Sequence, residues 1–242
     1  NRTFGGNSGR GGFDARRYNA RPEIAYEIPS FGGGVYCAAD TVVTFDNCTI
    51  TDNIAAKPSG TYYLDPYLGY GGGICAEDSA KVILNNCLIS DNEASIGGGI
   101  QWADETQLII TDCNVVDNDA FHGAGLHSVK NLNALSTITN TFIGRNMATD
   151  QPEPIVVDGQ GNDFIPPEQV TIPNQGGGYY CSSTIVDILD STFTENQASA
   201  SGGGIAFNGS DQNVAFDPLL HNSLITRNTA GRDGGGISVK WY

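Results

Sequence analysis

Positive charge is scarce in this 242-residue chain, which has 12 Lys plus Arg against 27 Asp plus Glu and a formal net charge of −15. A nucleic-acid partner is therefore not expected, because its phosphates would be repelled by most of such a surface. Long apolar runs are also missing, and none approaches the roughly 18 residues that a membrane-spanning helix needs. Charged residues make up only 16% of the chain, whereas Gly numbers 32. Low charge and abundant Gly together predict a folded, turn-rich, all-β protein.

The few basic residues are concentrated at the start of the chain. Five arginines fall within the first 21 residues, with only Asp14 against them. Residues 1–31 are therefore interpreted as an N-terminal basic segment. It is either a solvated tail or an arm that docks on an acidic surface, of this chain or of a neighbour.

A repeat runs through the rest of the chain. A glycine-rich triplet followed by a large apolar residue begins at Gly32, Gly71, Gly97, Gly123, Gly176, Gly202 and Gly234. Between consecutive triplets lies a second block, anchored on Asn53, Asn92, Asn118, Asn146, Asn196 and Asn228. Relative to this column Asn, position +2 is Ala, −3 and −8 are large and apolar, −5 is Cys, Thr or Ser, and −6 is Asn or Asp. Such self-similarity at a short period is typical of a solenoid.

The spacing of the apolar positions and of the triplets indicates the architecture of the repeat. The apolar positions alternate in short runs that are broken at the Asx, which is typical of strands and not of helices. The shortest interval between triplets, 26 residues, holds about three such strands with their turns. We therefore predict an all-β, right-handed, single-stranded parallel β-helix of about six to seven coils; its hand follows from the preference of parallel crossovers. The Asx column is expected in the left-handed conformation, which Asn and Asp tolerate best.

Insertions interrupt the repeat at one point. The column Asn is followed by the next triplet after five or six residues in four repeats, but the distance expands after Asn53 and after Asn146. The β-helix is therefore predicted over residues 32–242, with insertions at about 56–70 and 149–175; residues 1–31 would be a third expansion at the same point. Because coils stack in register, all the insertions should project from one corner. We expect any ligand to bind at that corner, although the insertions could also merely cover the coil wall.

The sequence resembles a known class of repeat. Gly-Gly-Gly-Ile paired with [Ile/Val/Phe]-x-x-Asn-x-Ala resembles the parallel β-helix repeats of bacterial and archaeal surface proteins. It is especially similar to the GGA[I/L/V] and FxxN repeats of polymorphic outer-membrane proteins and related autotransporter passengers. Phe193-Thr194-Glu195-Asn196 fits FxxN literally, and the other five blocks replace Phe with Ile or Val. The resemblance covers roughly residues 32–242 and implies an extracellular or cell-surface location. It does not select a function, because such repeats serve adhesins, fibres, surface layers and polysaccharide enzymes alike.

Three groups of residues are candidates for a specific role. The column asparagines are interpreted as a structural ladder of stacked amides, in preference to a row that binds sugar hydroxyls. The first insertion offers aromatic rings beside a carboxylate, which could stack on surface glycans or anchor a protein partner: Tyr62, Tyr63, Asp65, Tyr67 and Tyr70. In the second insertion, Asp158, Asp163 and Glu168 could hold Ca²⁺, the one cofactor that the sequence suggests; the alternative is a solvated acidic loop.

The six cysteines match no zinc pattern, because no two are separated by two to four residues. Cys48, Cys87 and Cys113 share the −5 column and are expected to be small core residues with free thiols. The alternative is a disulfide within a rung, between Cys37 and Cys48 or between Cys75 and Cys87.

Two classes of function fit these observations. We favour a non-catalytic extracellular structural, adhesive or fibre-forming protein, and the alternative is a carbohydrate-active β-helix enzyme. The basic residues of the repeat region are scattered, no Asp-Asp or Asn-Thr-Asp motif occurs, and the glycine of His122-Gly123 is explained by the triplet. The last triplet is not followed by an Asn block, so we also expect a section of something longer, or self-association with neighbouring subunits.

Overall fold

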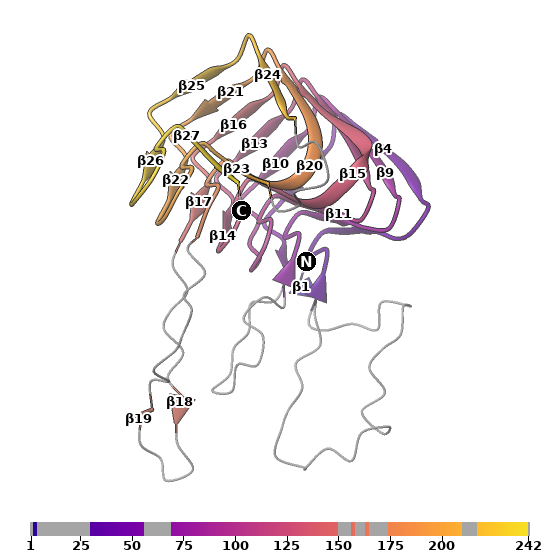
Figure 1. Ribbon diagram of the computed structural model, residues 1–242. Coiled ribbons are helices and arrows are strands. Elements are labelled where there is room, and N and C mark those ends of the chain that lie inside the picture. The colour runs from indigo at the N-terminus through magenta and orange to yellow at the C-terminus, as the bar shows by residue number, and fades with distance from the viewer. Residues whose placement is uncertain are drawn as a thin grey trace.

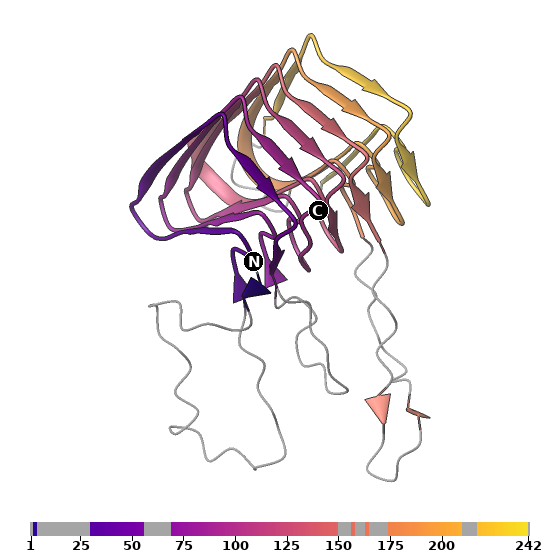
Figure 2. The same cartoon turned by 180° about the vertical axis from the view of Figure 1, so that it is seen from behind.

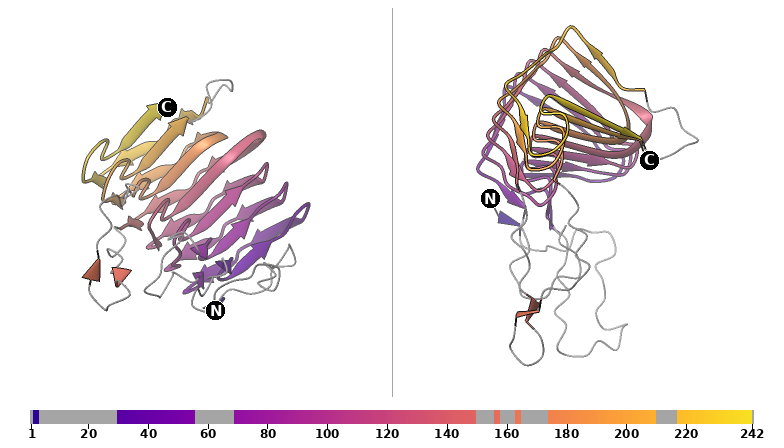
Figure 3. Two further views of the ribbon diagram at one scale, coloured as in Figure 1. Left: turned by 60° about the horizontal axis from the view of Figure 1, so that its bottom comes forward. Right: turned by 60° about the vertical axis from the view of Figure 1, so that its left-hand side comes forward.

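The computed structural model describes residues 2–3, 30–55, 69–149, 156–157, 163–164, 174–209 and 217–241. The chain winds around one axis, and its short strands stack in register on successive levels, which we call rungs (Figures 1 and 2). The indigo N-terminal strands and the yellow C-terminal strands lie at opposite ends of the stack (Figure 3). The predicted parallel β-helix is confirmed.

The first face of the β-helix follows the glycine triplets. Its strands pair in parallel in the order β27-β23-β20-β15-β11-β8-β3. They are β3 (Val35–Cys37), β8 (Ile74–Ala76), β11 (Ile100–Ala103), β15 (Leu126–Thr139), β20 (Tyr179–Leu189), β23 (Ile205–Gly209) and β27 (Ile237–Trp241). β15 and β20 are long enough to continue around the next corner. There they pair with the second face, formed by β4 (Val42–Asp46), β9 (Lys81–Asn85), β12 (Gln107–Thr111) and β24 (Leu219–His221).

The third face carries the FxxN-like blocks. It is a six-stranded parallel sheet of β5 (Thr49–Thr51), β10 (Leu88–Ser90), β13 (Asn114–Val116), β16 (Phe142–Gly144), β21 (Thr192–Thr194) and β25 (Leu224–Thr226). A strip of two-residue strands follows it: β14 (Asp119–Ala120), β17 (Met147–Ala148), β22 (Gln197–Ala198) and β26 (Thr229–Ala230). Four of the six +2 alanines lie in this strip, and three of these form a small cluster with Ala124.

The expanded segments join the β-helix at the corner between this strip and the first face. β1 (Arg2–Thr3) pairs with β6 (Ile54–Ala55), and β2 (Ser30–Phe31) pairs with β7 (Gly69–Tyr70). The amide of Thr149 donates to Ala120, and Asn174 accepts from Ala200. The residues that flank segments 4–29, 56–68 and 150–173 are therefore all held at this corner. β18 (Val156–Val157) and β19 (Asp163–Phe164) form an antiparallel pair. No helix that could span a membrane occurs in the described ranges.

The core is a stack of inward side chains, in which equivalent residues of successive rungs lie over one another. Its largest fully buried rings, Trp102 and Tyr179, stack with centroids 5.5 Å apart, although their strands β11 and β20 are separated by β15. Ser128 of β15 is small enough to leave this space, and its Oγ lies 2.8 Å from the Tyr179 hydroxyl. A large side chain in one rung is thus accommodated by a small one beside it.

The −6 Asx column occupies the corner between the second and third faces. All six residues have a left-handed backbone, with φ between 46° and 55°. The expectation of a left-handed Asx is confirmed. Apart from glycine, Asn and Asp are the residues that adopt this conformation most readily.

The column asparagines form a buried ladder beneath the next corner. Asn118 shows the pattern: its Oδ1 accepts from the backbone amide and the Nδ2 of Asn92, at 3.1 and 3.0 Å. Its Nδ2 donates to Asn146 Oδ1 at 2.9 Å and lies 3.0–3.1 Å from the carbonyl oxygens of Ile89 and Val116. The same amide-to-amide link joins Asn53 to Asn92, Asn146 to Asn196, and Asn196 to Asn228. Each amide therefore satisfies buried polar groups of its own and the adjacent rungs.

The cysteines are free thiols. In the −5 column, the backbone amides of Cys48 and Cys87 donate to the Sγ of the next cysteine at 3.4 and 3.3 Å. The disulfide alternative is not realised, and for one pair the reason is plain: Cys75 belongs to the outer side of β8, whereas Cys87 packs in the core. Burial raises the pKa of Cys37 and of Cys113 to about 11, so both thiols are protonated at neutral pH.

Candidate functional site

The corner where the insertions join carries two facing columns of side chains, which we call the outer seam. One column precedes the triplets and consists of Phe31, Tyr70, Ile96, His122, Gln175 and Ser201. Parallel bridges link its first four members to one another, and its last two to each other. The other points outward from the strands just after the triplets: Tyr36, Cys75, Gln101, His127, Tyr180 and Ala206.

The first glycine of each triplet brings these columns together. It has φ near +60°, which turns the chain sharply. A Cβ on Gly97 would lie 2.7 Å from Gln101 Cβ, and one on Gly123 would lie 2.7 Å from His127 Cβ. Because this first glycine has no side chain, the outward-pointing residue four positions after it can pack against the corner.

At its first rungs the outer seam is aromatic. The rings of Phe31 and Tyr70 stack with centroids 5.3 Å apart, and Tyr36 lies 5.9 Å from Phe31. All three are half-buried. Tyr70 is the one sequence-predicted ligand-binding residue that is described; Tyr62, Tyr63, Asp65 and Tyr67 lie outside the described residues.

The middle rungs of the outer seam are polar but buried. Cys75 is fully buried, and its Sγ donates to Gln101 Oε1 at 2.9 Å. Burial holds the pKa of this thiol well above its usual range, so it is not a ready nucleophile. In the next rung His122 and His127 are 6% and 5% exposed, and both contact the Tyr180 ring. Burial lowers the pKa of His122 to about 4 and that of His127 to about 3. Both imidazoles are therefore neutral at pH 7.

Beyond these rungs, Asn208 Nδ2 donates to Gln175 Oε1 at 2.9 Å, and Asn208 is buried. Lys240 then forms an ion pair with Asp233 at 3.4 Å. Along the axis, the side chains at this corner thus pass from the aromatic rings of the outer seam, through its neutral polar groups, to the ion pair that lies beyond it.

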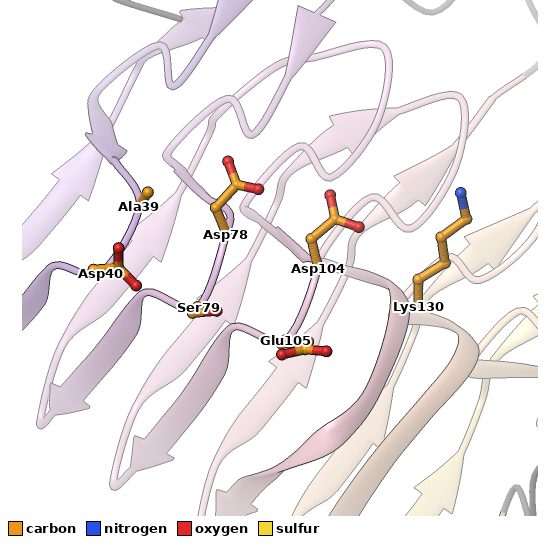
Figure 4. Close-up of a pocket in the computed structure, with 7 residues that line it drawn as sticks. All are labelled: Ala39, Asp40, Asp78, Ser79, Asp104, Glu105 and Lys130. Carbon is orange, nitrogen blue, oxygen red and sulfur yellow. The ribbon is translucent and has the colours of Figure 1, made fainter.

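A second feature lies between the first and second faces. A shallow hollow of about 450 Å³ is lined by Ala39, Asp40, Asp78, Ser79, Asp104, Glu105 and Lys130. Figure 4 shows Asp78, Asp104 and Lys130 pointing to the same side on successive rungs, with Asp40 and Glu105 in the row below. Asp78 and Asp104 have left-handed backbones, as has Lys130. Glu105 accepts from Asn133 Nδ2 at 2.6 Å. Sequence reasoning missed this hollow, although Asp78, Asp104 and Lys130 each stand seven residues after a triplet begins.

The proposed calcium ligands are not brought together in the described part of the chain. Asp158 and Glu168 lie outside it, and Asp163 is described only as part of the two-residue strand β19. Among the described residues no group of three His, Cys, Asp or Glu side chains is placed to hold a metal ion.

Two family models match the sequence. The model of the right-handed β-helix region matches residues 18–165, which is more than half of the chain. The Chlamydia polymorphic membrane protein repeat matches residues 190–208, the segment that contains β21, β22 and the literal FxxN block. No curated protein and no solved structure matched the chain. With its parallel strands stacked rung upon rung and the family model covering most of its length, the chain belongs to the right-handed parallel β-helix family.

Proposed function

We propose that the protein is a non-catalytic β-helix scaffold of an extracellular surface protein, which binds partners at the corner that carries its insertions. One observation carries this proposal: the residues flanking all three expanded segments are held at one corner of an otherwise regular β-helix. A regular solenoid brings the points at which such segments join it close together, as other rigid scaffolds do for their binding loops. The repeat match at residues 190–208 supports a cell-surface location.

Glycans of a cell surface are the partner class that this corner fits best. Phe31, Tyr36 and Tyr70 offer half-buried aromatic rings there, and aromatic side chains provide large contact surfaces on which sugars can stack. We expect Tyr70→Ala to weaken binding to a responsive glycan at least tenfold, as measured on a glycan array and then by calorimetry. The matched control is Leu135→Ala, because Leu135 is 42% exposed and lies near the end of β15 that pairs with the second face, away from this corner. Equal binding by both variants would contradict the placement.

A carbohydrate-active enzyme is the second candidate, and the carboxylates of the hollow favour it. Asp78 and Asp104 point to the same side from adjacent rungs (Figure 4), and paired carboxylates are what glycoside hydrolysis requires. We expect no release of reducing or unsaturated ends when the protein is incubated with acidic polysaccharides, with or without Ca²⁺. Release that disappears in the double variant Asp78→Asn, Asp104→Asn would overturn the non-catalytic proposal and place catalysis at the hollow.

A further inference from the structure

Three segments of the chain carry the pattern Asn-x-Ser/Thr with a residue other than proline in the middle, which is the acceptor signal for N-linked glycosylation of exported proteins. They begin at Asn1, Asn47 and Asn208. Asn1 lies outside the described residues, as does Ser210, the third residue of the last segment. Asn47 and Asn208 are both described, and their surroundings differ.

Asn47 lies at the corner between β4 and β5. Its backbone is left-handed, with φ of 55°, and the residue is exposed to solvent. The exposure is a property of this corner, because all six residues of the −6 column are exposed, in the middle of the stack as well as near its ends. The corner therefore holds Asn47 where a bulky group can be attached without entering the core.

The side-chain amide of Asn47 is held by an atom that glycosylation does not change. Its Oδ1 accepts from Asn86 Nδ2 at 2.6 Å, and this bond orients the side chain. N-linkage replaces one hydrogen of Nδ2 and leaves Oδ1 in place, so the bond to Asn86 can persist beside a glycan. Two residues later, Thr49 is exposed at the start of β5. Both residues that define the acceptor signal therefore lie on the surface.

Asn208 is placed in the opposite way. It is 5% exposed and lies in β23, where it pairs with Ser182 of β20 on one side and with Lys240 of β27 on the other. Its Nδ2 donates to Gln175 Oε1 at 2.9 Å. A sugar on this nitrogen would have to displace Gln175 or a neighbouring strand, so the closed β-helix has no room for it.

We propose that Asn47 is a site of N-linked glycosylation and that Asn208 is not. The oligosaccharide comes from a lipid-linked pyrophosphate donor. A bond forms between Nδ2 and the first carbon of the sugar, the bond from that carbon to the pyrophosphate oxygen breaks, and lipid pyrophosphate and the amide proton leave. The proposal rests on the extracellular location proposed above, because this modification belongs to exported chains. The glycan is attached at a different corner from the one where the insertions join.

Secretion of the whole chain from a eukaryotic cell line tests the site. Every variant carries Asn1→Gln, which removes the signal outside the described residues, and a tag with its own acceptor signal shows that the host modifies the exported chain. In the secreted fraction that has a β-sheet circular dichroism spectrum, we expect a glycan at Asn47. Peptide mapping after enzymatic release finds it, because release leaves an aspartate at each modified position. Asn208 should be unmodified in this fraction, since a chain modified there would not close.

Matched variants separate the acceptor signal from exposure alone. Asn47→Gln and Thr49→Val should each abolish the glycan, whereas Thr49→Ser should retain it. Asn222→Gln, which changes another exposed residue of the −6 column, should have no effect. An unmodified Asn47 beside a modified tag, or a glycan on Asn208 in the folded fraction, would overturn the proposal. Because the host imposes secretion, either result would leave the proposed extracellular location unaffected.

Discussion

Replacing Asn118 by alanine is expected to lower the free energy of unfolding by about 3–5 kcal/mol, because each buried polar group left without a partner costs about 1–3 kcal/mol. The substitution removes the acceptor of two Asn92 donors and the donor to Asn146 and to two carbonyl groups. The loss should appear as a lower midpoint of urea unfolding and as faster amide exchange in the rungs on either side.

The matched control for this prediction is Asn114→Ala in the same rung. Asn114 is exposed at the start of β13, and the change should alter stability by no more than about 0.5 kcal/mol. Asn118→Asp should be more harmful than alanine at neutral pH, since a carboxylate oxygen would replace the Nδ2 that faces two carbonyl oxygens. Similar stabilities for the variants at 114 and 118 would mean that the ladder contributes little.

Adding one methyl group at Gly99 is expected to cost about 3 kcal/mol or more. A Cβ there would lie 2.5 Å from the carbonyl oxygen of Gly125 and 3.1 Å from Asn118 Nδ2, so two backbones that pair at this point would have to separate. The position does not require a positive φ, so the cost is one of space and not of backbone conformation. Circular dichroism and thermal unfolding of Gly99→Ala should show a marked fall in the unfolding temperature.

The chain supplies its own control at the equivalent position of the last triplet. A Cβ on Gly236 would meet only Ile225 Cγ2, at 3.2 Å, because no further rung lies against it among the described residues. We expect Gly236→Ala to change stability by less than about 1 kcal/mol. A large effect at both positions would show that the third glycine is needed for conformation and not for close approach.

The fold could be predicted because stacking in register gives equivalent positions of every rung the same surroundings. The −6 Asx, the −3 apolar residue and the column Asn each meet one environment six times, and so each keeps one chemical type. The outer seam carries no such signal. Ile96, His122 and Gln175 occupy one column, because their surroundings change from rung to rung and no single type is required.

The sequence also did not indicate which large and small core side chains lie next to one another. Trp102, Ser128 and Tyr179 fit one another across strands that are far apart in the chain, and nothing in the repeat indicates which small residue accommodates which ring. The hollow was missed because its acidic column is interrupted by Lys130, so that the pattern extends over too few rungs to be recognised. The hollow lies where the repeat pattern is interrupted. At such a position too few rungs share a residue type for the sequence to show a pattern.

The asparagine ladder gives the long axis a direction. All five links point the same way, from the Nδ2 of one rung to the Oδ1 of the next toward the C-terminal end. A row of amides aligned in this manner has a donor pole at Asn228 and an acceptor pole at Asn53, so its dipoles add instead of cancelling. A neighbour that extended the row would have to join head to tail, since like poles would set donor against donor. Contacts of that heterologous kind produce open, polar filaments in preference to closed two-fold dimers.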